Sequence, residues 1–583
     1  MANGIQGLMI WGKTTLCLTV GRAGFWDHRG GETFLPRGTY KDVRRLVESK
    51  DQAALIQLFS RGARAENHPK RPQQYGCGRI ELDFGPDWEL IEGQLSLEHG
   101  EVSIDLQHRN DNRRTAKIRI QQVRFAELIR VVWHGDPDLD PQILARPTWE
   151  SVGETMEKLA IQAPRVWENG NDSGGFFQTL PEDNGLALAW RKAGSEIFIA
   201  TALGTDPLPQ AEELAHGKHW EFEQEATRLW WNKYWEDVPR VYLPDADLQE
   251  LYDYGIYRQA GLTPPEGLPA TLQGPWMEDT RIPAWSNDYH FNINVQLIYG
   301  TCLPSNRPDH LWPLWNLIKG WMPQLQIAGE AFFEVPGAFM LPHAVDDRCQ
   351  VVGTFWAGTI DHACIAWMGL LAWQHYRHTM DREVLEAIAW PMLKGTFIGY
   401  RAMLEWREEP GETPHWSLPI SVSPEFGGSD LELCQGRDAS FQLAALHRTL
   451  EILPQAAELL GLEIDPAWNE VGKDLPPYTV VDLPDREWEK NRRGIGLWKG
   501  KALPFSHRHH SHLGSLHPFD SIDPTAPEHQ EIIRESLRNW IETGPGRWSG
   551  WCVPWASMIC SKVGMVDMAA WGRISSVRWS AAS

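Results

Sequence analysis

Alternation of apolar and polar residues runs through the first 200 or so residues and predicts β-structure. Leu95 and Leu97 alternate with polar neighbours before a four-residue turn. Val102, Ile104 and Leu106 alternate in the same way after it. Two runs of period two joined by a short turn predict a hairpin with one buried face. Many short strands of this kind with turn residues between them predict an all-β sandwich.

The pattern changes near Pro209, where apolar residues begin to recur at helical spacing. Five residues are expected on one side of a helix over 211–235: Phe222, Ala226, Leu229, Trp230 and Tyr234. Further helical segments follow between loops rich in proline and glycine: 358–378, 382–405, 438–460 and 526–543. Asp438 is placed to cap the third of these. We find no repeat of fixed period, and successive helices with long loops predict a helical barrel or solenoid.

The two patterns divide the 583 residues, too many for one ordinary domain, into three parts. We expect a β-sandwich at 1–208, linking helices at 209–245 and a helical domain at 246–583. The loops of the helical domain carry the polar and aromatic clusters, so a functional site is expected there.

Composition excludes several classes of function. The chain has 55 basic and 77 acidic residues and a net charge of −22, which argues against a nucleic-acid partner. It has no apolar run of about 18 residues, so no membrane span is predicted. Its eight cysteines are scattered and predict buried free thiols, with no paired Cys-x-x-Cys motif for a metal. The N-terminus lacks the order of a signal peptide, so the chain as written is not expected to be exported. No cofactor is expected.

The chain contains 31 tryptophans, a clear excess. Trp230, Trp231 and Trp235 are expected to pack as one helix face. Tryptophans in stretches rich in proline and glycine favour exposed rings instead: Trp276, Trp285, Trp356 and Trp416.

Residues 269–299 combine neutral amides with aromatic rings. Asn292 and Asn294 stand one residue apart and would share an orientation if the segment is extended. Amides hydrogen-bond hydroxyls both as donors and as acceptors, and ring faces cover the C–H faces of sugars. The segment therefore predicts a site for a neutral, polyhydroxylated ligand, a glycan or oligosaccharide.

Glu425 is a candidate general acid. It follows a proline and stands near Val422 and beside Phe426. An apolar setting raises the pKa of a carboxyl group, as a general acid near neutral pH requires. The alternative is a loop glutamate that caps a neighbouring helix.

Residues 507–512 contain four histidines in six positions. Because no carboxylate or cysteine lies nearby in the sequence, a metal is the less favoured interpretation. Hydrogen bonds from imidazole and guanidinium groups to sugar hydroxyls fit better, and the alternative is a surface loop. Trp551 and Trp555, in the stretch after Ser549, are expected to serve packing.

The order of these motifs resembles glycoside hydrolase family 95, which contains inverting 1,2-α-L-fucosidases and related α-L-galactosidases. The resemblance rests on LQG-x-W, PAW-x-x-x-Y, NIN-x-Q, SPE, HRH-x-SHL and GW-x-x-x-W, in that order. It implies an N-terminal β-sandwich, linking helices and an (α/α)6 barrel. The family would add a C-terminal β-domain, for which this chain has no room.

Carried over residue by residue, the resemblance makes Glu425 the general acid, with Asn292 and Asn294 holding the attacking water. The other residues that it implies for the sugar pocket are His290, Trp356, and His507 or His509. Phe426 departs from the family, which has asparagine after the glutamate.

The family's catalytic aspartate lies in a downstream motif resembling FQIDGNFG, and we find no such motif here. The last residues are rich in serine and interrupted by Gly572, which does not resemble a continuing barrel helix. We therefore expect a fragment or a frameshifted product that lacks the last barrel helices and the C-terminal domain. Another carboxylate, Asp438 or Asp361, would have to replace the base.

The sequence thus predicts an exo-acting, inverting α-glycosidase that removes terminal α-L-fucosyl or α-L-galactosyl residues. One rival is another helical-barrel carbohydrate enzyme, a phosphorylase or a polysaccharide lyase; the neutral amides argue against the uronate site of a lyase. A second rival is a sugar-binding protein without catalysis, which the missing aspartate favours.

Overall fold

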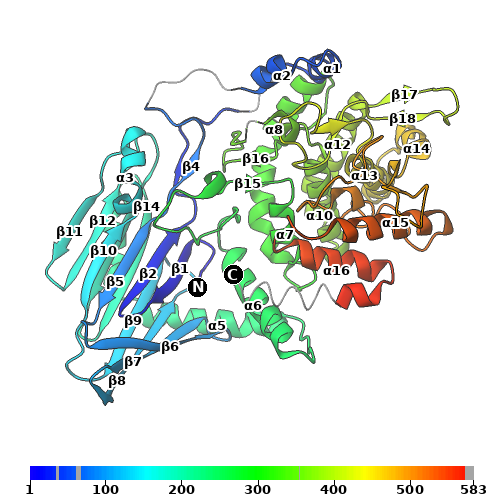
Figure 1. The fold of residues 1–583 in the computed structure, drawn as a ribbon. Helices are drawn as coiled ribbons and strands as arrows, with labels where there is room; N and C mark the ends of the chain where they lie inside the picture. The colour runs from blue at the N-terminus through cyan, green and yellow to red at the C-terminus, as the bar shows by residue number, and fades with distance from the viewer. Residues whose placement is uncertain (34–37, 61–66, 354, 571–583) are drawn as a thin grey trace.

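A computed structural model describes residues 1–33, 38–60, 67–353 and 355–570. It has a β-sandwich followed by connecting helices and a helical domain, which confirms the predicted multidomain fold class (Figure 1). The serine-rich C-terminal end with Gly572 lies outside the described residues. No helix in the described parts of the chain is both long and apolar enough to span a bilayer.

Two antiparallel sheets form the sandwich. The four-stranded sheet has the order β1 (Gln6–Gly12), β2 (Thr15–Arg22), β5 (Gly78–Asp83) and β10 (Gln142–Pro147). The eight-stranded sheet has the order β11 (Arg165–Asn169), β12 (Ser173–Gln178), β13 (Gly185–Lys192), β14 (Glu196–Gly204), β9 (Leu128–Gly135), β8 (Asp111–Gln122), β7 (Glu101–His108) and β6 (Trp88–Ser96).

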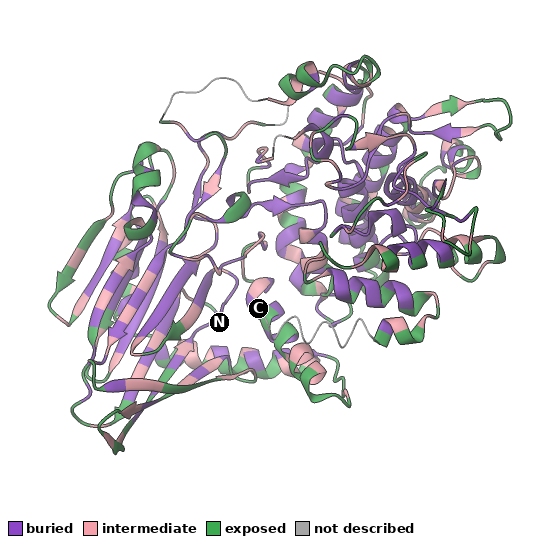
Figure 2. Cartoon of the chain, in the orientation of Figure 1, coloured by how far each residue is buried: buried purple, intermediate pink, exposed green. Residues whose placement is uncertain are grey.

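The predicted hairpin is the β6–β7 pair. Leu95 lies opposite Val102 in its register, and Val102, Ile104 and Leu106 are buried. Alternate residues of both sheets face one apolar core (Figure 2). Strands β13 and β14 are buried on both faces, because their other face packs against helix α4 (Leu208–Ala215) in a second core.

Two N-terminal helices leave the sandwich and pack on the helical domain. They are α1 (Tyr40–Glu48) and α2 (Gln52–Phe59), which lie beside α8 at the top of Figure 1. Tyr40, Val43 and Leu55 belong to the hydrophobic core of the helical domain. The prediction of β-structure for the first 200 residues is therefore wrong for these two elements.

The linking region contains α4 (Leu208–Ala215), α5 (Trp220–Asp237) and α6 (Ala246–Leu262). The predicted apolar face of α5 is wrong, because Phe222 and Leu229 are exposed. The buried face consists of Trp220, Thr227, Trp231 and Tyr234, and it shares only Tyr234 with the predicted face. Trp230, Trp231 and Trp235 do join one aromatic cluster, as expected.

The helical domain is built on six longer helices: α8 (Trp312–Phe333), α10 (Ala363–Thr379), α12 (Trp390–Met403), α13 (Ser440–Leu460), α15 (Pro527–Thr543) and α16 (Cys552–Lys562). Helix α10 is apolar on almost all sides and packs against α12 and α13 in the core. Asp438 does not cap α13, since its carboxylate binds the Ser417 hydroxyl and the Leu418 amide instead. All eight cysteines are buried free thiols.

Candidate active site

Glu425 lies in a loop that its neighbours hold at several points. Strand β19 (Ser421–Val422), just before the loop, pairs with β20 (Gln435–Gly436), just after it. The Ser423 hydroxyl lies 2.6 Å from that of Ser511, in the histidine-rich segment. Glu425 itself has a φ of 61°, in the left-handed region that glutamate rarely adopts. Strain of this kind persists where the surroundings enforce it, and it is common in functional sites.

Four side chains from two distant segments surround the Glu425 carboxylate. Asn292 Nδ2 donates to Oε1 at 2.9 Å, and His290 Nε2 lies 3.9 Å from the same oxygen. His509 Nε2 lies 3.2 Å from Oε2, to which the Arg508 guanidinium also donates. The fold therefore brings residues 290–292, 425 and 508–509 together in one polar cluster.

The cluster reverses the expected shift in the pKa of Glu425. Burial by itself raises this pKa, but the hydrogen bond and charge of His509 and the charge of Arg508 outweigh it. The pKa of Glu425 is therefore held well below its ordinary value, and the prediction of a raised pKa is wrong for this arrangement. The apolar neighbours in the sequence matter less than the cations that the fold adds.

Asn292 lies in a turn between a short strand and a short helix. Strand β15 (Tyr289–His290) pairs with β16 (Ala344–Val345), and α7 (Asn294–Gly300) begins two residues after Asn292. The segment is therefore not extended through Asn294, and the expectation that Asn292 and Asn294 point the same way from one strand is wrong. The Oδ1 atom of Asn292 is buried and has no hydrogen-bond partner in the parts of the chain that the structure describes. This acceptor is available to a water or a sugar hydroxyl.

Beside Asn292, His290 is oriented by a buried carboxylate. Its Nδ1 lies 3.0 Å from Asp288 Oδ1, while Nε2 faces Glu425. Burial lowers the pKa of His290, but Asp288 outweighs it and the pKa is raised.

The histidine-rich segment is an interior loop, because all four of its histidines are buried. His509 contacts Glu425, whereas His507 stacks on Phe426 with ring centroids 3.9 Å apart. His507 Nδ1 also accepts from the His509 amide at 3.1 Å. Phe426, which replaces the family's asparagine, is thus part of the support for His507. The guanidinium of this segment, that of Arg508, was expected to bind sugar hydroxyls, and its contact with Glu425 was not predicted.

The tryptophans differ from expectation. Only Trp285 of the four candidates is clearly exposed, at 63%, while Trp276 is half-buried and Trp356 and Trp416 are buried. The indole of Trp356 is 1% exposed and donates to the carbonyl of Ser429 at 3.2 Å. Trp356 therefore supports the loop that carries Glu425.

The two candidate replacement bases have different surroundings. The carboxylate of Asp438 is occupied by Ser417 and Leu418. Asp361 accepts a hydrogen bond from Gln442 Nε2 at 2.6 Å, and its burial raises its pKa to about 7, with a smaller contribution from the charge of Glu425.

Comparison with known proteins places the chain in a family. The family model for the glycosyl hydrolase family 95 catalytic domain matches residues 215–575. Alpha-L-fucosidase 2 of Arabidopsis thaliana is 27% identical over 340 residues, which is 55% of this chain and 37% of that protein. Probable alpha-fucosidase A of Aspergillus niger is 30% identical over 147 residues, 25% of this chain and 18% of that protein. The chain thus matches well under two thirds of the length of either relative.

Among solved structures, a putative kojibiose phosphorylase from the human microbiome aligns with 98% of this chain and 81% of its own chain. The TM-score is 0.60 at 12% sequence identity, so this likeness concerns the fold. Because the family model covers more than half of the residues, including all those gathered around Glu425, the chain belongs to glycosyl hydrolase family 95.

Proposed function

We propose that this protein hydrolyses terminal α-L-fucosyl or α-L-galactosyl residues of glycans with inversion at the anomeric carbon. Glu425 is the general acid on the glycosidic oxygen, and Asn292 and Asn294 position the attacking water. Family membership and the fucosidase relatives support the reaction class and the fucosyl-type substrate.

The proposal rests on the two ends of the Asn292 side-chain amide. Its amide nitrogen donates to Glu425, while its buried oxygen has no partner among the described residues. A sugar that enters between Asn292 and Glu425 replaces the hydrogen bond between them, and Oδ1 of Asn292 remains as an acceptor for water. His290, His509 and Arg508 add hydrogen-bond donors for hydroxyl groups around the same point.

Inversion needs a base as well as an acid, with the two carboxyl groups about 6.5–9.5 Å apart. Asp361 is the better candidate of the two considered, because the charge of Glu425 acts on it, whereas Ser417 occupies both oxygens of Asp438. A pKa of about 7 suits a group that accepts a proton near neutral pH.

The test is release of fucose from a Fuc-α-1,2-Gal substrate, followed by NMR from the first turnovers. An inverting enzyme gives the β-anomer first, and initial α-fucose would rule the mechanism out. Glu425→Gln is expected to lower kcat by about 10²–10⁴-fold, the usual contribution of a general acid. Glu432→Gln, an exposed change in the same loop, is the matched control and should retain activity.

A second candidate function is sugar binding without bond cleavage. The charges of His509 and Arg508, which hold Glu425 as a carboxylate, favour it. Fucose binding by calorimetry with no activity in either the wild type or Glu425→Gln would select this function. A parallel assay with phosphate tests the phosphorylase alternative, whose product would be a sugar 1-phosphate.

A further inference from the structure

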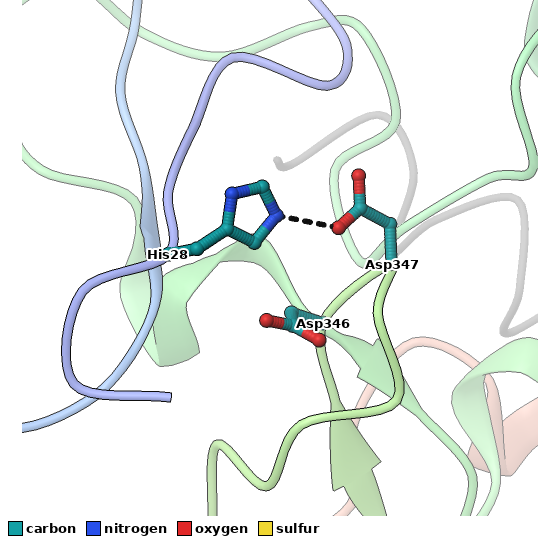
Figure 3. A group of neighbouring side chains, drawn as sticks. All are labelled: His28, Asp346 and Asp347. Carbon is teal, nitrogen blue, oxygen red and sulfur yellow. Dashed lines mark hydrogen bonds and ion pairs between the residues drawn. The ribbon is translucent and has the colours of Figure 1, made fainter. Parts of the chain in front are cut away.

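His28 lies between carboxylates where the sandwich meets the helical domain. Its Nδ1 is 2.7 Å from Asp183 Oδ1, and its Nε2 is 2.6 Å from Asp347 Oδ1. Asp183 belongs to the sandwich, whereas Asp347 follows strand β16 in the helical domain. Figure 3 shows the imidazole directed at Asp347, with Asp346 beside the pair.

Asp346 contributes an oxygen without a partner. The residue is 0% exposed, and its Oδ1 accepts from the backbone amides of Arg348 at 2.9 Å and Gln350 at 2.7 Å. Its Oδ2 is buried and has no hydrogen-bond partner among the described residues. A buried carboxylate oxygen without a partner is costly, and a bound cation would satisfy it.

The three side chains are close enough to share one ion. One ligand atom from each of His28, Asp346 and Asp347 lies within 4.8 Å of the other two. Ligands about 2.1 Å from zinc lie about 3 Å or more from one another, so a small opening of the His28–Asp347 contact would admit the ion. One imidazole with two carboxylates suits zinc or a similar transition metal better than magnesium or calcium, which prefer oxygen ligands.

The surroundings fit a metal site in two further respects. Asp183 binds the other ring nitrogen of His28, the arrangement that orients most metal-binding histidines. The carboxylates of Asp183, Asp346 and Asp347 lie around His28, and the Arg348 guanidinium is 2.9 Å from Asp183. A divalent ion would offset the excess negative charge.

We propose that His28, Asp346 and Asp347 bind a divalent transition-metal ion of the zinc type. The ion connects the loop after β3 (Trp26–Asp27), in the N-terminal part of the chain, to the loop after β16 in the helical domain. The same loops already meet through the Val351 amide, which donates to the Glu32 carbonyl at 2.9 Å. Because β16 pairs with β15, the ion also fixes the two-stranded sheet that carries His290.

The experiment uses the full chain after dialysis against a chelator. Zinc, manganese and calcium are then added separately, and bound metal is measured by mass spectrometry. One zinc or manganese ion per chain is expected in the wild type and in His134→Gln, a control that removes an exposed histidine of the sandwich. His28→Gln should abolish stoichiometric binding, and Asp183→Asn should weaken it by about 10–100-fold. Binding of cobalt should give a visible absorption spectrum that His28→Gln lacks.

Thermal unfolding gives a second measurement. Zinc should raise the Tm of the wild type and of His134→Gln in a concentration-dependent way, but not that of His28→Gln. Asp346→Asn, which alters the carboxylate whose Oδ2 has no partner among the described residues, should also remove the effect of zinc on Tm. If that variant does not fold, Asp347→Asn serves instead, since the Asp347 side chain is 34% exposed. Binding that is equal in His28→Gln and His134→Gln, or no bound ion in the wild type, would leave only a His28–Asp347 ion pair and overturn the proposal.

Discussion

Glu425 and Asp361 are both carboxylic acids in the interior of the helical domain, but their neighbours differ. His509 and Arg508 hold the pKa of Glu425 well below its ordinary value against the effect of burial, and the Asn292 amide adds to them. Asp361 has the neutral amide of Gln442 as its hydrogen-bond donor, and burial raises its pKa to about 7. The Glu425 carboxyl is charged at neutral pH in the free protein, whereas Asp361 is near its midpoint.

The comparison shows that burial alone does not decide the protonation of a carboxyl group. Burial is the largest contribution at both residues and raises the pKa at both. The charges of His509 and Arg508 decide the direction of the pKa shift at Glu425. Both residues come from a distant segment, with Arg508 83 residues after Glu425 in the chain. Where two carboxyl groups have pKa values pushed apart, the group with the raised pKa usually serves as the acid. The proposed roles are the reverse of this in the free protein, so they require the substrate to displace the contacts of Arg508 and His509 and let the pKa of Glu425 rise.

The largest effect is expected for Asp361→Asn on catalysis. If Asp361 is the base, kcat falls by about 10²–10⁴-fold while fucose binding is retained. The measurement is kcat on the fucosyl disaccharide beside Glu425→Gln. A variant within a few fold of the wild type would remove Asp361 from the chemistry.

Asp361→Asn should also weaken the dependence of the free energy of unfolding on pH. The folded pKa of Asp361 is raised above its unfolded value, so the native state binds more protons between about pH 4 and pH 7. Its contribution therefore reduces the free energy of unfolding as pH rises, by up to about 1.4 kcal/mol per pH unit. Urea unfolding at pH 4.5, 5.5 and 6.5 should show this decline in the wild type relative to Asp361→Asn. An unchanged difference between the two proteins at all three pH values would contradict it.

Removal of the cation beside Glu425 should move the pH profile of activity. Arg508→Gln raises the pKa of Glu425, and the protonated acid then persists to higher pH. The alkaline limb of kcat/KM is expected to shift upward by about one pH unit. Arg547→Gln is the control, because that guanidinium lies 5.0 Å from the Phe505 ring. A shift to lower pH in Arg508→Gln would mean that Glu425 does not act as the acid.

The smallest effect is expected for Tyr400→Phe. The Tyr400 hydroxyl donates to Gln442 Oε1 at 2.8 Å, and Gln442 donates to Asp361. Loss of one buried hydrogen bond should lower the free energy of unfolding by about 1 kcal/mol. Thermal and urea unfolding measure the change, and activity at pH 7 should stay close to that of the wild type.

The sequence predicted what depends on local pattern. The β6–β7 hairpin, the main helical segments and the order of motifs around Glu425 all follow from residues that are near neighbours in the chain. The lowered pKa of Glu425 could not be predicted in this way, because it depends on contacts between distant segments. For the same reason no pattern in the sequence pointed to His28, whose partner Asp347 is 319 residues away. The apolar face of α5 was misplaced because tryptophans occupy adjacent positions and support more than one helical face.

The helices α1 and α2 have a consequence for biosynthesis. The Tyr40 hydroxyl donates to the carbonyl of Ile420, and the Leu431 amide donates to Gln52 Oε1, across sequence separations of 380 and 379 residues. These early helices cannot reach their final contacts until the ribosome has made the segment around residue 431. At about 5–20 residues per second, 379 residues take about 20–75 s to synthesise. Helix α8, whose Phe332 and Phe333 also contact Tyr40, is complete earlier, so the apolar faces of α1 and α2 are only partly covered until residue 431 has been made.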